Sequence, residues 1–164
     1  MNKMVKITIV AVGKIKEKYL TLGIEEYQKR LTPYCRLSIV EVAEERLPED
    51  PSPAQKEQAL AKEGERLLKK IYSDGGYFFA LDRKGKSLSS EEFSQKMAAL
   101  ALAGQSEVSI AIGGAFGLSG EVLAGAQELI SFSSLTFTHQ MIRLFLVEQL
   151  YRSFKISRGE KYHW

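Results

Sequence analysis

The chain contains few of the residues that build disulfides and metal sites. Of its 164 residues, one is a cysteine, Cys35, so neither an internal disulfide nor a cysteine-rich metal site can form. The two histidines, His139 and His163, are too few for a zinc site. We therefore expect no bound metal, and we expect Cys35 to be a buried structural thiol in a reducing compartment.

Long apolar runs and a strong charge imbalance are also missing. No apolar run approaches the roughly 18 residues that a membrane span requires. Residues 1–7 lack the apolar segment and cleavage site of a signal peptide. The formal net charge of +3 excludes the global basic field of a dedicated DNA-binding protein. These absences predict a cytoplasmic protein with no membrane partner.

The pattern of short apolar runs and helical periodicities predicts the fold. The length favours one domain over residues 1–164. Strands are expected at 5–12, 36–42, 77–81, 107–112 and 129–133, with a loop at 82–86. Helices are expected at 15–31, 54–72, 90–103, 120–126 and 139–157. Strands that alternate with helices predict an α/β fold, a mostly parallel sheet with helices on both faces.

A glycine loop follows the predicted strand 107–112. The sequence Gly113-Gly114-Ala115-Phe116-Gly117 fits a ligand site at the carboxyl end of a parallel strand, although a tight turn explains it as well. Its spacing is neither that of a dinucleotide fingerprint nor that of a phosphate-binding P-loop, which disfavours a nicotinamide-dependent oxidoreductase. Together with Leu81 and residues 131–137 at other strand ends, the loop suits a flat, mostly neutral ligand such as an adenine-bearing cofactor.

The C-terminal helix combines apolar and charged residues. Apolar side chains surround it on nearly every side, so we expect it to be buried in a core or between subunits. Glu148 and Arg152 are four residues apart in the favoured orientation for an ion pair. A local excess of positive charge in 143–164 fits both a phosphate-bearing partner and a solvated helix end. Nothing in the sequence of residues 161–164 gives a structural reason for them to be ordered, so the residues alone predict a frayed end.

Four segments together resemble one protein family. They are Ile112–Leu118, Ser131–Gln140, Glu148–Arg152 and Gly159–His163, and with the opening 9–14 they are similar to the bacterial ribosomal RNA large-subunit methyltransferases H, of the SPOUT class. The resemblance covers essentially the whole chain. It implies a C-terminal trefoil knot, a homodimer packed through the last helix, and S-adenosylmethionine as cofactor. It also implies methylation of N3 of a pseudouridine in 23S rRNA on the assembled ribosome.

The resemblance also implies roles for individual residues. The cofactor contacts would be Leu81, Gly113, Phe132, Ser133, Ser134, Leu135, Thr136 and Phe137. Tyr162 and His163 would reach the active site of the partner subunit. The chain departs from the family pattern at Trp164, where a basic residue is usual, and at Thr138, where proline is common.

Within that implied reaction, His163 is the candidate general base, because its unperturbed pKa lies nearest neutral pH. Tyr162 would orient it, and Arg143 is a further catalytic candidate. Arg143 and Arg152 either hold phosphate or pair with Glu148. Arg152, Lys161 and Trp164 are candidate RNA contacts, the last by stacking on a base. The alternative function is a non-catalytic RNA- or ribosome-binding α/β protein whose glycine loop is only a turn.

Overall fold

A five-stranded parallel sheet forms the centre of the protein. The structure is a computed structural model that describes residues 4–162. The strands lie in the order β2-β1-β4-β3-β5, and every neighbouring pair is parallel. Their bounds are β1 Lys6–Val12, β2 Arg36–Val42, β3 Tyr77–Ser87, β4 Glu107–Ile112 and β5 Glu128–Ser131.

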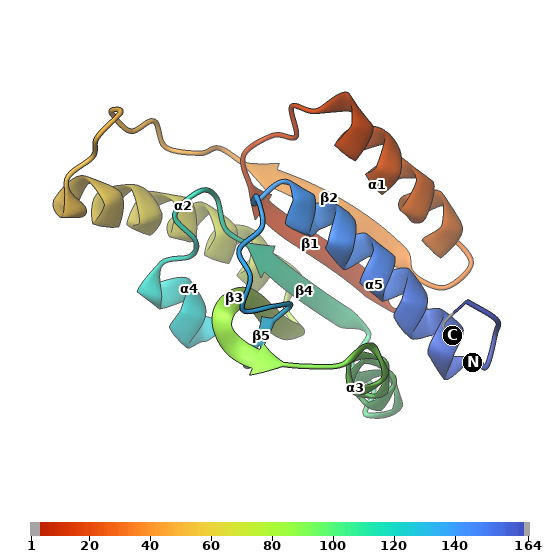
Figure 1. Cartoon of the computed structure of the whole chain (residues 1–164). Coiled ribbons are helices and arrows are strands. Elements are labelled where there is room, and N and C mark those ends of the chain that lie inside the picture. Colours follow the sequence, from red (N-terminus) through yellow and green to blue (C-terminus); the bar gives the residue numbers. More distant parts are fainter. Residues whose placement is uncertain (1–3, 163–164) are drawn as a thin grey trace.

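Helices cover both faces of this sheet, as the sequence predicts (Figure 1). On one face α5 lies between α1 and α3, and α2 and α4 pack on the other. Their bounds are α1 Lys18–Leu31, α2 Pro53–Asp74, α3 Ser90–Leu102, α4 Gly120–Gly125 and α5 Met141–Ser157. The predicted α/β class is confirmed.

The central strands contribute to two cores because both of their faces are buried. In β1, Ile7 and Ile9 pack into the core under α1, α3 and α5, while Val10 and Val12 pack under α2. This explains why β1 is a continuous apolar run rather than an alternating one. Cys35 is buried as predicted, and burial raises the pKa of its thiol to about 12.

Strand β3 is longer than the sequence predicts. Residues 82–86, expected as a loop, belong to β3, and both Leu81 and Lys86 pair with Ile130 across a register shift. The strand therefore bends around β5 (Figure 1). A Cβ atom at Gly85 would lie 2.6 Å from the carbonyl carbon of Leu129, so only glycine allows this approach.

In the single chain, helix α5 is fully buried on one side, and the burial of its other side between subunits stays a prediction. Its fully buried residues face the sheet and the flanking helices, and they are Arg143, Leu146, Val147, Leu150 and Ser153. Leu144 and Phe145 are only half-buried. The outward face of α5 thus keeps apolar side chains at the surface of the single chain.

Candidate functional site

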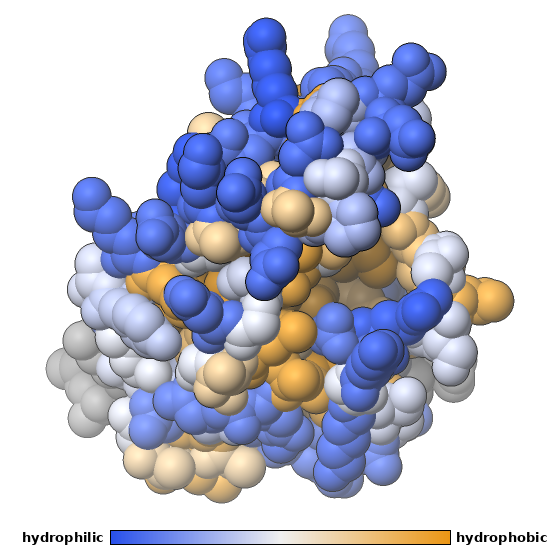
Figure 2. Space-filling view, turned by 90° about the vertical axis from the view of Figure 1, so that its left-hand side faces the viewer, coloured by the Kyte–Doolittle hydropathy of each residue, from blue (hydrophilic) through white to orange (hydrophobic). Residues whose placement is uncertain are grey.

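A cavity of about 180 Å³ lies beside the bend of β3 and the ends of β4 and β5. Because the strands are parallel, the loops that follow them meet at one edge of the sheet. Figure 2 views the molecule from the side toward which the strands point, and apolar residues gather at the centre of this face within a hydrophilic surround. The residues that line the cavity are Leu81, Asp82, Arg83, Ile112, Gly113, Gly114, Gly117, Ile130, Phe132, Ser133, Leu135, Thr136, Phe137, His139 and Ile142.

The glycine loop forms one wall of this cavity. A Cβ atom at Gly113 would lie 2.3 Å from the carbonyl oxygen of Gly117, so any side chain there would displace the loop. Gly117 has a φ of 86°, which disfavours other residues. The loop closes with a hydrogen bond from the Gly117 N–H to the Gly114 carbonyl. Both close packing and access to the cavity therefore require glycine at position 113.

The segment after β5 forms the opposite wall and is ordered by its own hydroxyl groups. Ser131 donates a hydrogen bond to the Ser133 carbonyl at 3.1 Å, and the Leu135 N–H donates to Ser133 Oγ at 2.9 Å. Thr138 Oγ1 accepts from the Met141 N–H at 3.2 Å, so this hydroxyl serves the start of α5. The side chain of Leu135 is 71% exposed, which leaves it available to a ligand.

Seven of the eight residues predicted to contact the cofactor line this one cavity. They are Leu81 at the bend of β3, Gly113 after β4, and Phe132, Ser133, Leu135, Thr136 and Phe137 after β5. Ser134 lies in the same exposed turn but is not among the lining residues. The structure thus brings the predicted residues together, while their contact with a cofactor stays a prediction.

Arg143 ties the start of α5 to the end of β1. Its side chain is 1% exposed. The guanidinium donates to the carbonyls of Val12 and Gly13 at 2.7 and 2.8 Å, and to Glu41 Oε2 at 2.7 Å. The same Glu41 oxygen accepts from the Ile15 N–H at 3.0 Å. One buried cation therefore fixes α5, β2 and the loop that follows β1.

The electrostatics of Arg143 follow from this burial. Desolvation lowers its pKa from the ordinary value, and the hydrogen bond to Glu41 opposes that shift. An arginine guanidinium remains charged at neutral pH in either case. Its Nε is unpaired among the described residues. The alternative that Arg143 pairs with Glu148 is wrong, and although its catalytic role stays a prediction, these contacts favour a positioning role.

His139 lies at the rim of the cavity just before α5. Burial and the neighbouring charge of Arg143 lower the pKa of its imidazole. The adjacent Gln140 accepts a hydrogen bond from the Lys16 N–H at 3.2 Å. The helix begins at Met141, so His139 belongs to the loop and not to the first turn that the sequence predicts.

The described part of the tail folds back on its own chain, contrary to the expected frayed end. Tyr162 donates to Glu148 Oε1 at 3.0 Å, and its hydroxyl lies 3.3 Å from that of Tyr27. Arg152 pairs with Glu148 as predicted and lies 4.8 Å from the centre of the Tyr162 ring. Burial and these hydrogen bonds raise the pKa of Tyr162. Its phenol therefore stays protonated at neutral pH.

The remaining predicted tail residues divide into two groups. Lys161 is exposed, as an RNA contact would need to be, but no contact tests that role. His163 and Trp164 lie outside the described residues. The predicted catalytic base therefore stays a prediction.

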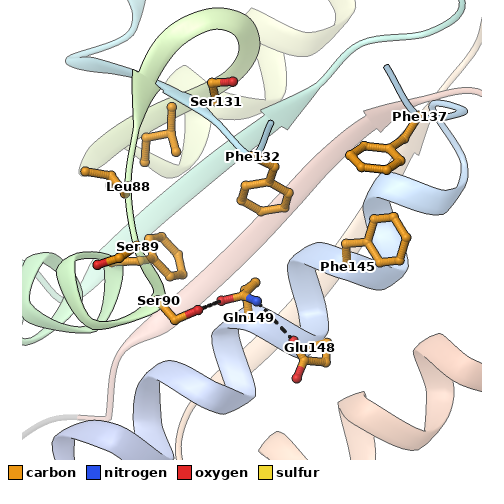
Figure 3. A pocket seen from close by; sticks show the side chains of 11 residues that line it. Leu88, Ser89, Ser90, Ser131, Phe132, Phe137, Phe145, Glu148 and Gln149 are labelled. Atoms are coloured by element: carbon orange, nitrogen blue, oxygen red, sulfur yellow. Dashed lines mark hydrogen bonds between the residues drawn. The ribbon is translucent and has the colours of Figure 1, made fainter. Parts of the chain in front are cut away.

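A second cavity of about 480 Å³ adjoins the first and shares Ile130, Phe132 and Phe137 with it. It lies between the start of α3 and the middle of α5 (Figure 3). Its other lining residues are Leu88, Ser89, Ser90, Phe93, Ser131, Phe145, Glu148 and Gln149. Residues 4–162 contain no cluster able to hold a metal ion, and no helix among them is long and apolar enough to cross a membrane.

Sequence reasoning missed Glu41, Ser90 and Gln149. Glu41 lies on the predicted strand 36–42, on the same face as Leu37 and Ile39. An acidic residue on an inward face weakly indicates a buried partner of opposite charge. Nothing in the sequence indicates that its partner lies 102 positions away. Ser90 and Gln149 meet only because α3 and α5 pack together.

Comparisons with known proteins identify relatives along the whole chain. Residues 5–163 match a family model described as predicted SPOUT methyltransferase. The ribosomal RNA large subunit methyltransferase H of Carboxydothermus hydrogenoformans is 55% identical over 158 residues, which are 96% of this chain and 99% of the relative. The protein of the same name from Moorella thermoacetica is 54% identical over 160 residues, covering 98% and 99% of the two chains.

A solved structure shares the fold at much lower identity. The structure of a probable methyltransferase from Bordetella pertussis superposes with a TM-score of 0.56 at 13% identity. The match covers 91% of this chain and 96% of that one. At this identity the likeness shows a common fold alone.

Replacing Arg143 by methionine tests how much the buried hydrogen bonds of its guanidinium stabilise the fold. The variant removes the guanidinium donor from two carbonyls and from Glu41, so we expect a loss of about 3–5 kcal/mol in the free energy of unfolding. Arg30→Met is the control, because it removes an exposed ion pair with Glu26 and should change stability little. Urea denaturation measures both, and equal losses would contradict the role of Arg143.

The lowered pKa of His139 predicts a pH dependence. The folded chain keeps the imidazole neutral at pH values where the unfolded chain, with an ordinary pKa of 6.5, binds a proton. Unfolding then takes up a proton, so stability is present above about pH 6.5 and falls as the pH drops below it. Urea denaturation between pH 5 and 8 should show a flatter profile for His139→Gln than for the wild type, and parallel profiles would refute the assignment.

Proposed function

Because the chain belongs to the SPOUT methyltransferase family, we propose that it methylates large-subunit ribosomal RNA with S-adenosylmethionine as methyl donor. The names of relatives that are 54–55% identical over nearly their full length support this activity. We further propose that the acceptor is N3 of a pseudouridine in 23S rRNA on the assembled ribosome. Such a substrate places the protein in the cytoplasm.

The observation that carries the proposal is the convergence of the β3 bend and the ends of β4 and β5 on one cavity. Its walls offer backbone groups, the hydroxyls of Ser133 and Thr136, and apolar faces from Leu81 and Leu135. This donor set fits adenosine, whose adenine base is flat and which carries no phosphate. Gly113 would let the backbone approach it closely, and Leu135 and Phe137 would cover it. The bound cofactor supplies a methyl group on a positively charged sulfur.

Methyl transfer requires the chain to place N3 in line with that methyl group. The N3 electron pair would form the new carbon–nitrogen bond as the methyl group left the cofactor sulfur, and the N3 proton would pass to a base of the chain. We propose His163 as this base. Tyr162 is unsuited to accept a proton because its pKa is raised and its hydroxyl donates to Glu148.

A trefoil knot and a homodimer are part of the proposal. The bend of β3 around β5, and the return of the chain from β5 at the sheet edge to α5 between α1 and α3, support a threaded C-terminal segment. Tyr19 and Leu22 on α1 are 61% and 55% exposed, and Gly23 beside them packs on Leu144 of α5. This apolar surface supports a dimer that includes α5. In such a dimer the C-terminal tail of one subunit would reach the active site of the other.

Titration calorimetry with S-adenosylmethionine tests the cofactor site. We expect saturable heat with the wild type and at least tenfold weaker binding with Gly113→Ala, because the new Cβ atom would displace the loop. Gly120→Ala is the matched control, since no atom lies within 4 Å of its added Cβ. A non-catalytic RNA-binding protein would give no saturable heat even as wild type.

Replacing His163 by alanine tests the general base. We expect the variant to fold and to bind S-adenosylmethionine like the wild type. Its single-turnover rate of methyl transfer to ribosomes should fall by about 10²–10⁴-fold, the usual contribution of a general base. An unchanged rate would remove His163 from the mechanism.

A further inference from the structure

The second cavity carries an oriented carboxamide at its polar end. Ser90 Oγ donates to Gln149 Oε1 at 2.9 Å, and Gln149 Nε2 donates to Glu148 Oε2 at 3.2 Å (Figure 3). A carboxamide oxygen accepts two hydrogen bonds and its nitrogen donates two. The two neighbours therefore hold the Gln149 amide in place and leave it one further acceptor site and one further donor site.

Aromatic side chains form much of the rest of the cavity. Phe132 and Phe137 both project toward its interior in Figure 3. Phe137 packs edge-on against Phe145, with ring centres 5.3 Å apart and planes at 77°. A space bounded by rings on one side and a carboxamide on the other suits a flat heterocycle that stacks with its face and forms hydrogen bonds with its edge.

The charges of the lining residues further limit which ligand can bind in the cavity. No lysine or arginine lines this cavity among the described residues, and its one ionisable lining group is Glu148. A phosphate or other anion would therefore be disfavoured. A neutral nucleobase with adjacent N–H and C=O groups matches the donor and acceptor sites of Gln149.

We propose that this cavity binds the acceptor base, and that Gln149 recognises pseudouridine by pairing with its N1–H and C2=O. The proposal rests on the proposed function. In pseudouridine the ribose is attached through carbon, so N1 carries a hydrogen, whereas in uridine N1 carries the ribose and has none. Pairing at N1 and C2 leaves N3 unengaged. The shared wall of Ile130, Phe132 and Phe137 places that base beside the cofactor cavity.

Methyl-transfer kinetics on two kinds of ribosome test this specificity. The substrates are ribosomes whose 23S rRNA has pseudouridine or uridine at the acceptor position. The wild type should prefer pseudouridine by about tenfold or more in kcat/KM, because uridine lacks the N1–H donor and leaves the acceptor site of Gln149 unpaired. Gln149→Leu should lose that preference, because its rate falls more on pseudouridine than on uridine, and Gln149→Glu, which keeps an acceptor for N1–H, should show an intermediate preference.

Two controls separate recognition of the base from other effects. Gln95→Leu replaces an exposed glutamine of α3 and should behave as the wild type. Affinity for S-adenosylmethionine, measured by calorimetry, should be equal in all four proteins, because Gln149 does not line the cofactor cavity.

Three outcomes would overturn the proposal. The first is a wild type that methylates both kinds of ribosome at equal rates, and the second is a Gln149→Leu variant that still prefers pseudouridine. The third is a Gln149→Leu variant whose rate falls equally on both kinds of ribosome, as expected if the cavity holds part of a second subunit. A wild type that binds no S-adenosylmethionine and methylates neither ribosome would overturn the proposed function as well. In the first three cases methyl transfer by the wild type would leave the proposed function standing.

Discussion

The buried guanidinium of Arg143 is the contact on which the geometry of the site depends. It joins the first turn of α5 to the end of β1 and to Glu41, through three hydrogen bonds of 2.7 to 2.8 Å. Residues 132–140 connect β5 to this helix. The hydrogen bonds of Arg143 therefore hold one end of this segment in place, and the sheet holds the other. A buried charge is costly unless it is paired, and here carbonyl and carboxylate oxygens provide that pairing.

The parallel sheet explains why two cavities lie side by side. All strands end at one edge, so loops that are distant in sequence come together there. Phe132 follows β5 directly and borders both cavities, one formed largely by strand ends and the other by the facing surfaces of α3 and α5. A donor in the first and an acceptor base in the second would meet across this boundary.

The sequence predicted the layers of this fold well because the burial of a strand or helix determines the spacing of its apolar residues. The strands 36–42 and 107–112 have the predicted bounds, since each is a short apolar or alternating run between polar turns. The cofactor residues were predicted through resemblance and through their places at strand ends. All but Ser134 of that set line one cavity.

What the sequence did not reveal depends on tertiary contacts. The extension of β3 beyond Leu81 is decided by its pairing with Ile130, which no local periodicity encodes. The order of Tyr162 depends on Glu148 and Tyr27, which lie 14 and 135 positions away. The partner of Arg143 was missed for the same reason, because ion pairs between distant elements leave no spacing signal.

Mass spectrometry of 23S rRNA from a strain that lacks this protein tests whether the chain methylates a pseudouridine there. We expect the loss of one methyl group from a single pseudouridine, restored by the wild-type chain and not by His163→Ala. An rRNA with an unchanged set of methyl groups would contradict it.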